Sequence, residues 1–403
     1  MKLKKLMTVM AVAGLVLPGA AMATNGMFAS GYGMTASGMG GAATAMSEDT
    51  FGGANNPASM VFVGDRIDFG ASLFSPRREA TSMDFGAGNG SSTTIPSDKN
   101  YFGVPELGYN KMMSKDLSLG VSVYGNGGMN TDYAPGSNNI NYYGNTGRLG
   151  VDLVQLIVAP TLAYKIAPNH SIGISPLIGY ERFKADGVLN NGTNNSSINP
   201  GYSDAFGYGV RIGYMGKITP DFTIGAAYAS KVAMGKLSKY ENNLLAPGNG
   251  TLDLAENYSV GVAYKATPDL TVALDYMRIN YGNVASIGTS TAKGGFGWHD
   301  IDVWKLGAQY KYNKNWTMRA GFNHGDNPIH SADTFNNIIA PGVVKDHLTM
   351  GTTYVTSTGG ELTVAYTHAF ENSITGPNAA VPTSPTTIRM HQDILGIAYG
   401  WKM

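Results

Sequence analysis

Basic side chains that could hold an anion are the chemically most suggestive residues of this chain. Three of them lie in segments where apolar residues alternate with small or polar ones, and they fall on the face opposite the apolar side chains: Arg211, Lys305 and Arg319. Charge-assisted hydrogen bonds would hold a carboxylate ligand there. Glu181 and Asp275 share this face, and buried charges are usually paired. The sequence therefore leaves two interpretations open, a ligand site or internal ion pairs.

Motifs of common enzymes and metal sites are missing. The sequence has no Gly-x-Ser-x-Gly elbow, His-Glu-x-x-His pair or phosphate-binding loop, and it has no Cys for thiol chemistry or disulfides. The seven His are scattered, and His324 with His330, or His299 beside Asp300, would bind a metal only by chance. We expect no enzyme activity, no cofactor and no metal. A net charge of zero gives no electrostatic footprint for nucleic acid.

The N-terminus has the pattern of a secretory signal peptide. Lys2, Lys4 and Lys5 precede the apolar run 6–17, and Ala21-Met22-Ala23 fits the small-x-small cleavage rule. The apolar run is shorter than the ~20 residues that a membrane-spanning helix needs. We predict that residues 1–23 are a signal peptide cleaved after Ala23 and that the chain is exported.

Period-two alternation predicts β-strands along the rest of the chain. In 206–214, large apolar residues occupy one face, and Gly and Arg occupy the other. Six short turns and seven long loops connect the expected strands, and short turns at one rim with long loops at the other are typical of an outer-membrane barrel. The fourteen expected strands span residues 66–74, 99–113, 117–129, 149–166, 170–185, 204–218, 221–233, 251–266, 269–282, 300–313, 316–324, 345–355, 361–370 and 388–402. Such barrels usually end in an aromatic residue, whereas here Lys402 and Met403 follow Trp401.

Motifs in a fixed order resemble the FadL family of outer-membrane transporters for long-chain fatty acids and other hydrophobic compounds. They are Asn56-Pro57-Ala58, the first strand Arg66–Phe74, the stretches 151–155 and 159–164, Trp298-His-Asp300, the run 315–321, and Asp326-x-Pro328. The resemblance covers essentially the whole mature chain. It implies an all-β fold: a 14-stranded antiparallel transmembrane β-barrel, residues 66–403, with an N-terminal hatch (plug), residues 24–65, inside the lumen.

The third expected strand loses its alternation near its end. After clean alternation from Leu117 it continues into Gly125, Asn126, Gly127 and Gly128. Glycines inside a strand mark bulges or bends, and the resemblance places a kink and a lateral opening here. The alternative interpretation is that these glycines begin the following loop.

Ligand contacts follow mainly from the resemblance. Apolar candidates are Met27 and Phe28 in the hatch and Met129 beyond the kink. Arg319 is the best cationic candidate because it lies in the family-like run 315–321. Arg182 aligns loosely with a basic residue near the family's pocket. For each Met and each cation, ordinary packing or pairing is the alternative.

The expected function is passive uptake of hydrophobic molecules, long-chain fatty acids or related hydrocarbons, with lateral release at the kinked third strand. Alternatives are a channel for aromatic or alkane hydrocarbons and a general porin or adhesin-type barrel. A general porin has no use for the apolar, glycine-rich residues before its first strand. The resemblance implies a monomer in the outer membrane of a Gram-negative bacterium. Its partners would be a hydrophobic small molecule and outer-membrane lipid or lipopolysaccharide, without nucleic acid.

Overall fold

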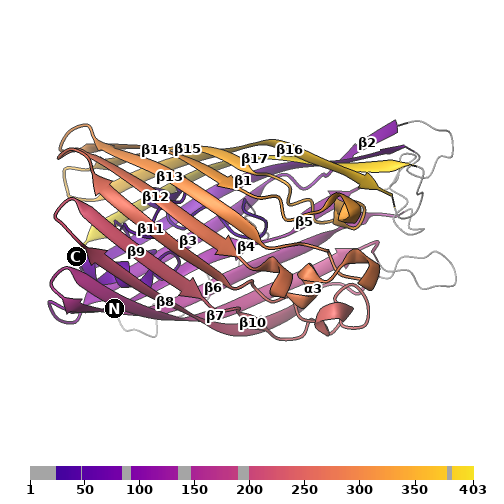
Figure 1. Ribbon diagram of the computed structural model, residues 1–403, viewed down its shortest axis with the longest axis horizontal. Helices are drawn as coiled ribbons and strands as arrows, with labels where there is room; N and C mark the ends of the chain where they lie inside the picture. The colour runs from indigo at the N-terminus through magenta and orange to yellow at the C-terminus, as the bar shows by residue number, and fades with distance from the viewer. Residues whose placement is uncertain (1–23, 47, 84–91, 135–146, 189–198, 379–383) are drawn as a thin grey trace.

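The fold is a closed antiparallel β-barrel (Figure 1). The structure, a computed structural model, describes residues 24–403 except 47, 84–91, 135–146, 189–198 and 379–383. The expected signal peptide, residues 1–23, lies outside the described residues. The sheet closes because its first strand, β1 (Arg66–Met83), pairs with its last, β17 (Pro385–Lys402), over their whole length. Closure joins the first and last strands and so removes the two free edges that an open sheet would have, as a spanning barrel requires.

Seventeen strand segments build the barrel's fourteen strands, so the predicted fourteen-stranded barrel is confirmed. Three strands consist of two segments each: β2 (Ser92–Pro96) with β3 (Phe102–Met112), β4 (Leu117–Gly127) with β5 (Asn130–Tyr133), and β9 (Phe222–Ala229) with β10 (Ala233–Met234). The others are β6 (Leu149–Ala167), β7 (His170–Asp186), β8 (Ser203–Lys217), β11 (Asn257–Lys265), β12 (Leu270–Ile279), β13 (Ile301–Lys311), β14 (Trp316–Gly325), β15 (Asp346–Val355) and β16 (Glu361–Pro377).

Two strands run further than the sequence pattern indicates. The pattern ends the first strand at Phe74 and the thirteenth at Phe370, but β1 continues to Met83 and β16 to Pro377. The reason is that the outward side chains of these extensions are polar or charged. Alternation of apolar residues therefore stops where the strand leaves the apolar band, while the hydrogen-bonded ladder continues.

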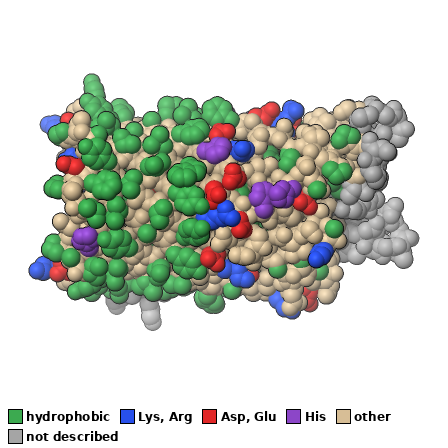
Figure 2. Space-filling view, in the orientation of Figure 1, with side chains coloured by type: hydrophobic (Ala, Val, Ile, Leu, Met, Phe, Trp, Pro, Cys, Tyr) green, Lys and Arg blue, Asp and Glu red, His purple; other side chains and the backbone are tan. Residues whose placement is uncertain are grey.

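The outer surface carries a band of exposed apolar side chains over one half of the barrel's length (Figure 2). Leu73, Ile174 and Leu306 are among them, each more than two-fifths exposed. Charged and His side chains lie at the rim of this half and again from near the middle of the barrel (Figure 2). Toward the long-loop ends of their strands, outward polar contacts include the Arg278–Asp302 ion pair and the hydrogen bond between His324 and Asp346. An apolar belt bounded by polar groups is the surface that lipid requires.

Short helices belong to the hatch segment and the long loops. They are α2 (Met34–Ser37) and η1 (Pro57–Phe62) in the hatch segment, and η2 (Ala246–Gly248), η3 (Tyr281–Asn283), α3 (Ala285–Gly288), η4 (Thr291–Lys293), η5 (Ser331–Asp333) and η6 (Asn336–Ile338) in the loops. Among the described residues, no helix has the length and apolar character needed to cross a membrane. The loop helices gather at the end of the barrel away from the C-terminus (Figure 1). Buried loop residues such as Ile287, Phe296 and Phe335 form one apolar cluster there.

The segment ahead of β1, residues 24–65, packs against the inner face of the wall, and most of its described residues are buried. We call it the hatch segment. Where it touches the wall, the wall residue is repeatedly a glycine on which a Cβ would meet hatch atoms at 3.0 Å or less. These glycines are Gly108, Gly120, Gly173, Gly213, Gly225, Gly261, Gly307, Gly321, Gly351 and Gly396. Because glycine has no side chain, these positions on the wall leave room for the hatch segment.

Asn56-Pro57-Ala58 shows how the hatch segment docks. The Asn56 side chain caps η1 by accepting from the Ala58 N–H at 3.1 Å. Gly173 and Gly213 face each other on β7 and β8. A Cβ on Gly173 would lie 2.4 Å from the Pro57 carbonyl carbon, and one on Gly213 would lie 2.0 Å from Asn56 Oδ1. The motif therefore needs two paired glycines on the wall.

We predict that Gly173→Ala displaces the hatch segment around Pro57. The added methyl group would meet backbone, which cannot rotate away, and overpacking of this kind costs about 1–3 kcal/mol. A lower thermal midpoint and faster proteolysis of the hatch segment in purified protein would check this. Gly103→Ala is the matched control, because a Cβ at Gly103 meets no atom within 4 Å. Equal thermal midpoints and equal rates of hatch proteolysis in the two variants would contradict the prediction.

Candidate functional site

The N-terminal end of the hatch segment meets the loop cluster. Met27 and Phe28 are buried, and the Met27 N–H donates to Tyr281 Oη at 2.6 Å. Tyr281 Oη in turn donates to the Asn25 carbonyl oxygen at 2.6 Å. Burial raises the pKa of the Tyr281 phenol, so the group stays neutral and can serve as donor and acceptor together. The two apolar candidates of the hatch are thus held under the loops by one tyrosine.

The third barrel strand is interrupted at the predicted glycine stretch. Its ladder with β3 runs only from the pair Met112↔Ser118 to the pair Glu106↔Tyr124. Its ladder with β6 shifts register between Gly125 and Gly127, and β5 resumes pairing with β6 alone. Asn126 Oδ1, inside the break, accepts from Tyr32 Oη of the hatch segment at 2.8 Å. The loss of alternation therefore coincides with a break in the strand and not with the start of a loop.

Polar contacts span this break. Lys99 Nζ on the second-strand side donates to Asp152 Oδ2 of β6 at 2.7 Å, although a strand lies between them. Tyr202 Oη donates to the same oxygen at 2.8 Å. The Asp98 N–H also donates to the Asp132 carbonyl oxygen at 2.8 Å. Sequence patterns did not indicate these residues, because they are far apart along the chain.

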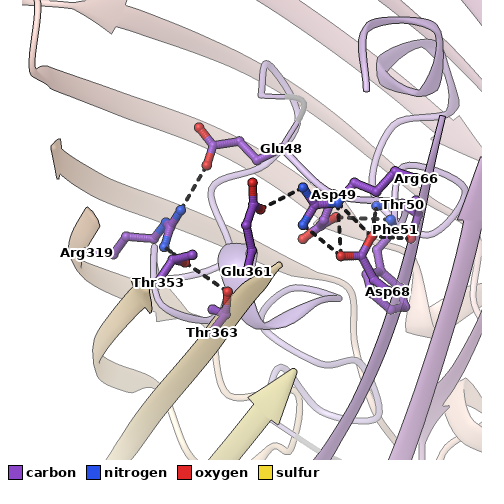
Figure 3. Close-up of polar contacts among 10 residues, drawn as sticks. All are labelled: Glu48, Asp49, Thr50, Phe51, Arg66, Asp68, Arg319, Thr353, Glu361 and Thr363. Carbon is purple, nitrogen blue, oxygen red and sulfur yellow. Dashed lines mark hydrogen bonds and ion pairs between the residues drawn. The ribbon is translucent and has the colours of Figure 1, made fainter. Parts of the chain in front are cut away.

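Arg319, the best cationic candidate, binds the hatch segment (Figure 3). Its Nε donates to Gln309 Oε1 at 2.6 Å, its Nη1 to Thr353 Oγ1 at 2.6 Å and its Nη2 to Glu48 Oε2 at 3.0 Å. Glu48 belongs to the hatch segment. All three nitrogens of the guanidinium are thus occupied in this arrangement, and the assignment of Arg319 as a ligand contact stays a prediction.

A second ion-pair network ties the hatch segment to β1 and β16 (Figure 3). Arg66 bonds to Asp68 at 2.8 Å and to Glu361 at 2.7 Å. The Thr50 N–H and hydroxyl donate to Asp68 Oδ2 at 3.1 and 2.7 Å. Burial, together with the Asp68 carboxylate, raises the pKa of nearby Asp49 to about 7. Charge on the wall thus orients hatch backbone directly.

Arg211 and Lys305 line one cavity between hatch segment and wall. Lys305 Nζ donates to the Ser30 carbonyl oxygen at 2.7 Å and lies opposite Asp275 in the β12–β13 ladder. Arg211 Nη1 donates to the Asn55 carbonyl oxygen at 3.5 Å, while its Nε has no hydrogen-bond partner among the described residues. The structure therefore brings these two cations together, and both face the hatch backbone.

Two of the remaining charges lie elsewhere. Arg182 is on the outer surface, about half exposed, with its guanidinium 3.8 Å from the centre of the Tyr202 ring. It is not in the lumen with Arg211. Glu181 points inward and accepts from Gln155 Nε2 at 3.1 Å, but in the part of the chain that the structure describes it pairs with no cation. Within the described ranges, no three His, Asp or Glu side chains gather as a metal site would require.

One buried cation was missed by the sequence patterns. Arg78 faces inward on β1 and is 3% exposed. It was overlooked because the expected first strand ended at Phe74; extending the same parity by four residues would have placed it on the lumen face. Met129, the third apolar candidate, lines the same cavity as Arg78.

Comparison with known proteins agrees with this architecture. Residues 9–399 match the family model described as outer membrane protein transport protein (OMPP1/FadL/TodX). No match emerges among curated protein sequences.

Solved structures share the fold at low identity. A Pseudomonas aeruginosa FadL homologue superposes with a TM-score of 0.71 at 15% identity, covering 94% of this chain and 99% of its own. The toluene transporter TodX of P. putida gives 0.68 at 17% identity, covering 93% and 99%. The toluene transporter TbuX of Ralstonia pickettii gives 0.64 at 19% identity, covering 93% and 99%. The family match over nearly the whole chain, on a barrel of this form, shows that the protein belongs to the FadL/TodX family of outer-membrane proteins that transport hydrophobic compounds.

Proposed function

We propose that this protein takes up long-chain fatty acids or related hydrocarbons by passive diffusion through the plugged barrel, with lateral release at the interrupted third strand. The observation that carries the proposal is the break between Gly125 and Asn130, which adjoins an apolar cavity inside the wall. A hydrophobic ligand gains nothing from a water-filled pore and needs an apolar path. An interrupted wall beside an apolar cavity supplies such a path toward lipid.

The hatch segment supports a selective transporter over a general porin. It packs against glycines around the wall and so fills a lumen that a porin would leave open to water. An adhesin-type barrel has no need of a strand break next to an internal cavity. No energy source is implied, so the flow is downhill.

Two substrate classes compete within this proposal. Two of the structural relatives are described as toluene transporters, and toluene is a neutral hydrocarbon. A fatty acid additionally needs a cation for its carboxylate. Buried cations of this chain supply that chemistry, which favours acids; aromatic or alkane hydrocarbons are the second candidate.

Direct binding tests the proposal. We expect purified protein to bind a radiolabelled long-chain fatty acid, a labelled neutral hydrocarbon, or both, in a saturable manner. Equilibrium dialysis in an uncharged detergent measures this, with an unrelated outer-membrane porin as control. Saturable binding of neither ligand would refute the transporter function.

A bulky side chain at the break should block release. Gly128 is buried and lines the cavity, so Gly128→Trp would fill the space through which a ligand passes toward lipid. We expect most of the uptake by cells to be lost while the barrel keeps its heat-modifiable migration in gels. Gly103→Trp, at an open outward position, is the control. Normal uptake through the Gly128 variant would exclude this route.

Hatch movement should become easier when the Arg319–Glu48 pair is weakened. Glu48→Gln keeps the shape but removes the charge from a hydrogen bond worth about 1.5–3 kcal/mol when one partner is charged. We expect faster amide hydrogen exchange in the hatch segment. Glu371→Gln is the control, because Glu371 is an exposed partner of Arg389 on the outer surface, where such pairs contribute little. Unchanged exchange in the Glu48 variant would show that this pair does not hold the hatch segment.

A further inference from the structure

Two neighbouring strands of the wall are interrupted side by side. The second strand is interrupted between β2 and β3, where residues 97–101 lie outside both ladders with β1. The third strand is interrupted between Gly127 and Asn130. Pro76 of β1, opposite the first gap, and Gly128, in the second gap, line the same cavity. The interruption of the wall is therefore two strands wide.

The segment in the first gap reaches across the second gap. Ser97 Oγ accepts from the Asp132 N–H at 3.0 Å, and the Asp98 N–H donates to the Asp132 carbonyl oxygen at 2.8 Å. These two bonds hold β5, the part of the third strand beyond the break. Lys99 extends further, past the third strand, and its Nζ lies 2.7 Å from Asp152 Oδ2 on the fourth strand, β6. One ion pair thus joins the two sides of the interruption.

This ion pair lies on the outer face of the wall. By strand parity Asp152 shares its face of β6 with Leu162, whose side chain is exposed on the apolar band. Only 11% of the Asp152 side chain is exposed, and its Oδ2 accepts from both Lys99 Nζ and Tyr202 Oη. A molecule that moves from the cavity through the interruption toward lipid therefore meets the Lys99–Asp152 pair.

The pair can separate at low cost. Because 36% of the Lys99 side chain is exposed, water and salt weaken its attraction to Asp152. If Lys99 moves away, Tyr202 Oη, at 2.8 Å, still donates to Asp152 Oδ2, so the carboxylate keeps a partner. The Arg66–Asp68 pair has no such freedom, since both of its side chains are only 5% exposed.

We propose that Lys99 and Asp152 form the gate pair of the lateral opening: the opening is closed while they are bonded and open when Lys99 moves away. Tyr202 is a positioning residue that holds Asp152 in both states. The inference rests on the proposed function and deepens it, because it names the contact that must break before a hydrophobic molecule reaches lipid.

A reversible cross-link tests the gate pair. The chain has no Cys, so Lys99→Cys combined with Asp152→Cys introduces its only thiols, which a short bifunctional methanethiosulfonate reagent joins through bonds that a reductant breaks. Uptake of radiolabelled oleic acid and hexadecane by cells is measured at equal amounts of heat-modifiable barrel, and mass spectrometry verifies the cross-link. We expect the cross-link to stop most of the uptake and the reductant to restore it. Each single Cys variant, treated with the same reagent, is a control.

Removal of the charge gives an independent measurement. We expect Lys99→Met to speed uptake by up to about fivefold, the scale of an ion pair near the surface. Lys231→Met is the matched control, because the Lys231–Asp253 pair has a similar distance, 2.8 Å, and similar side-chain exposure, 42% and 10%, but lies beside β10.

Uptake that persists through a verified cross-link, or equal acceleration by the Lys99 and Lys231 variants, would overturn the gate pair. Normal uptake by wild-type cells with no effect of either change defeats this inference alone. If wild-type cells take up neither compound, the proposed function itself fails.

Discussion

The lumen of a closed barrel has a fixed diameter, and the hatch segment must fit inside it. This constraint explains why glycine is so abundant on the inner face of the wall. Three glycine pairs that face each other across neighbouring strands lie against the hatch segment: Gly173↔Gly213, Gly225↔Gly261 and Gly307↔Gly321. Each leaves a shallow recess for hatch backbone. Irregular backbone at membrane depth is tolerated only where protein encloses it, so the recesses are a condition for the hatch segment to exist at all.

The same enclosure determines the use of charge. Hatch backbone brings polar groups into the lumen that need partners, and wall side chains provide them. Asp275 Oδ2 accepts from the Ala43 and Thr44 N–H groups at 2.9 and 2.8 Å, and Lys305 donates to Ser30. Cations that looked like ligand contacts are thereby engaged with the hatch segment.

The sequence alone predicts the barrel well and the site only in part. Alternation and turn spacing are local properties, so the strand count and most strand ranges follow from them. Partners of Arg319 and Arg78 depend on register around a closed circle and on where the hatch segment lies, which no local pattern encodes. The end of β1 was placed too early because its outward residues are polar or charged beyond the apolar band. That single error hid Arg78.

Hatch position and lumen charge are coupled through Glu48. Moving the hatch segment away from β14 would leave Arg319 with Gln309 and Thr353 but without its carboxylate. Separating such a pair inside protein is unfavourable unless another anion replaces the lost one. An acidic ligand could lower this penalty, whereas a neutral hydrocarbon could not. Under the proposed uptake of acids, this arrangement of charge would favour hatch movement when an acid is bound.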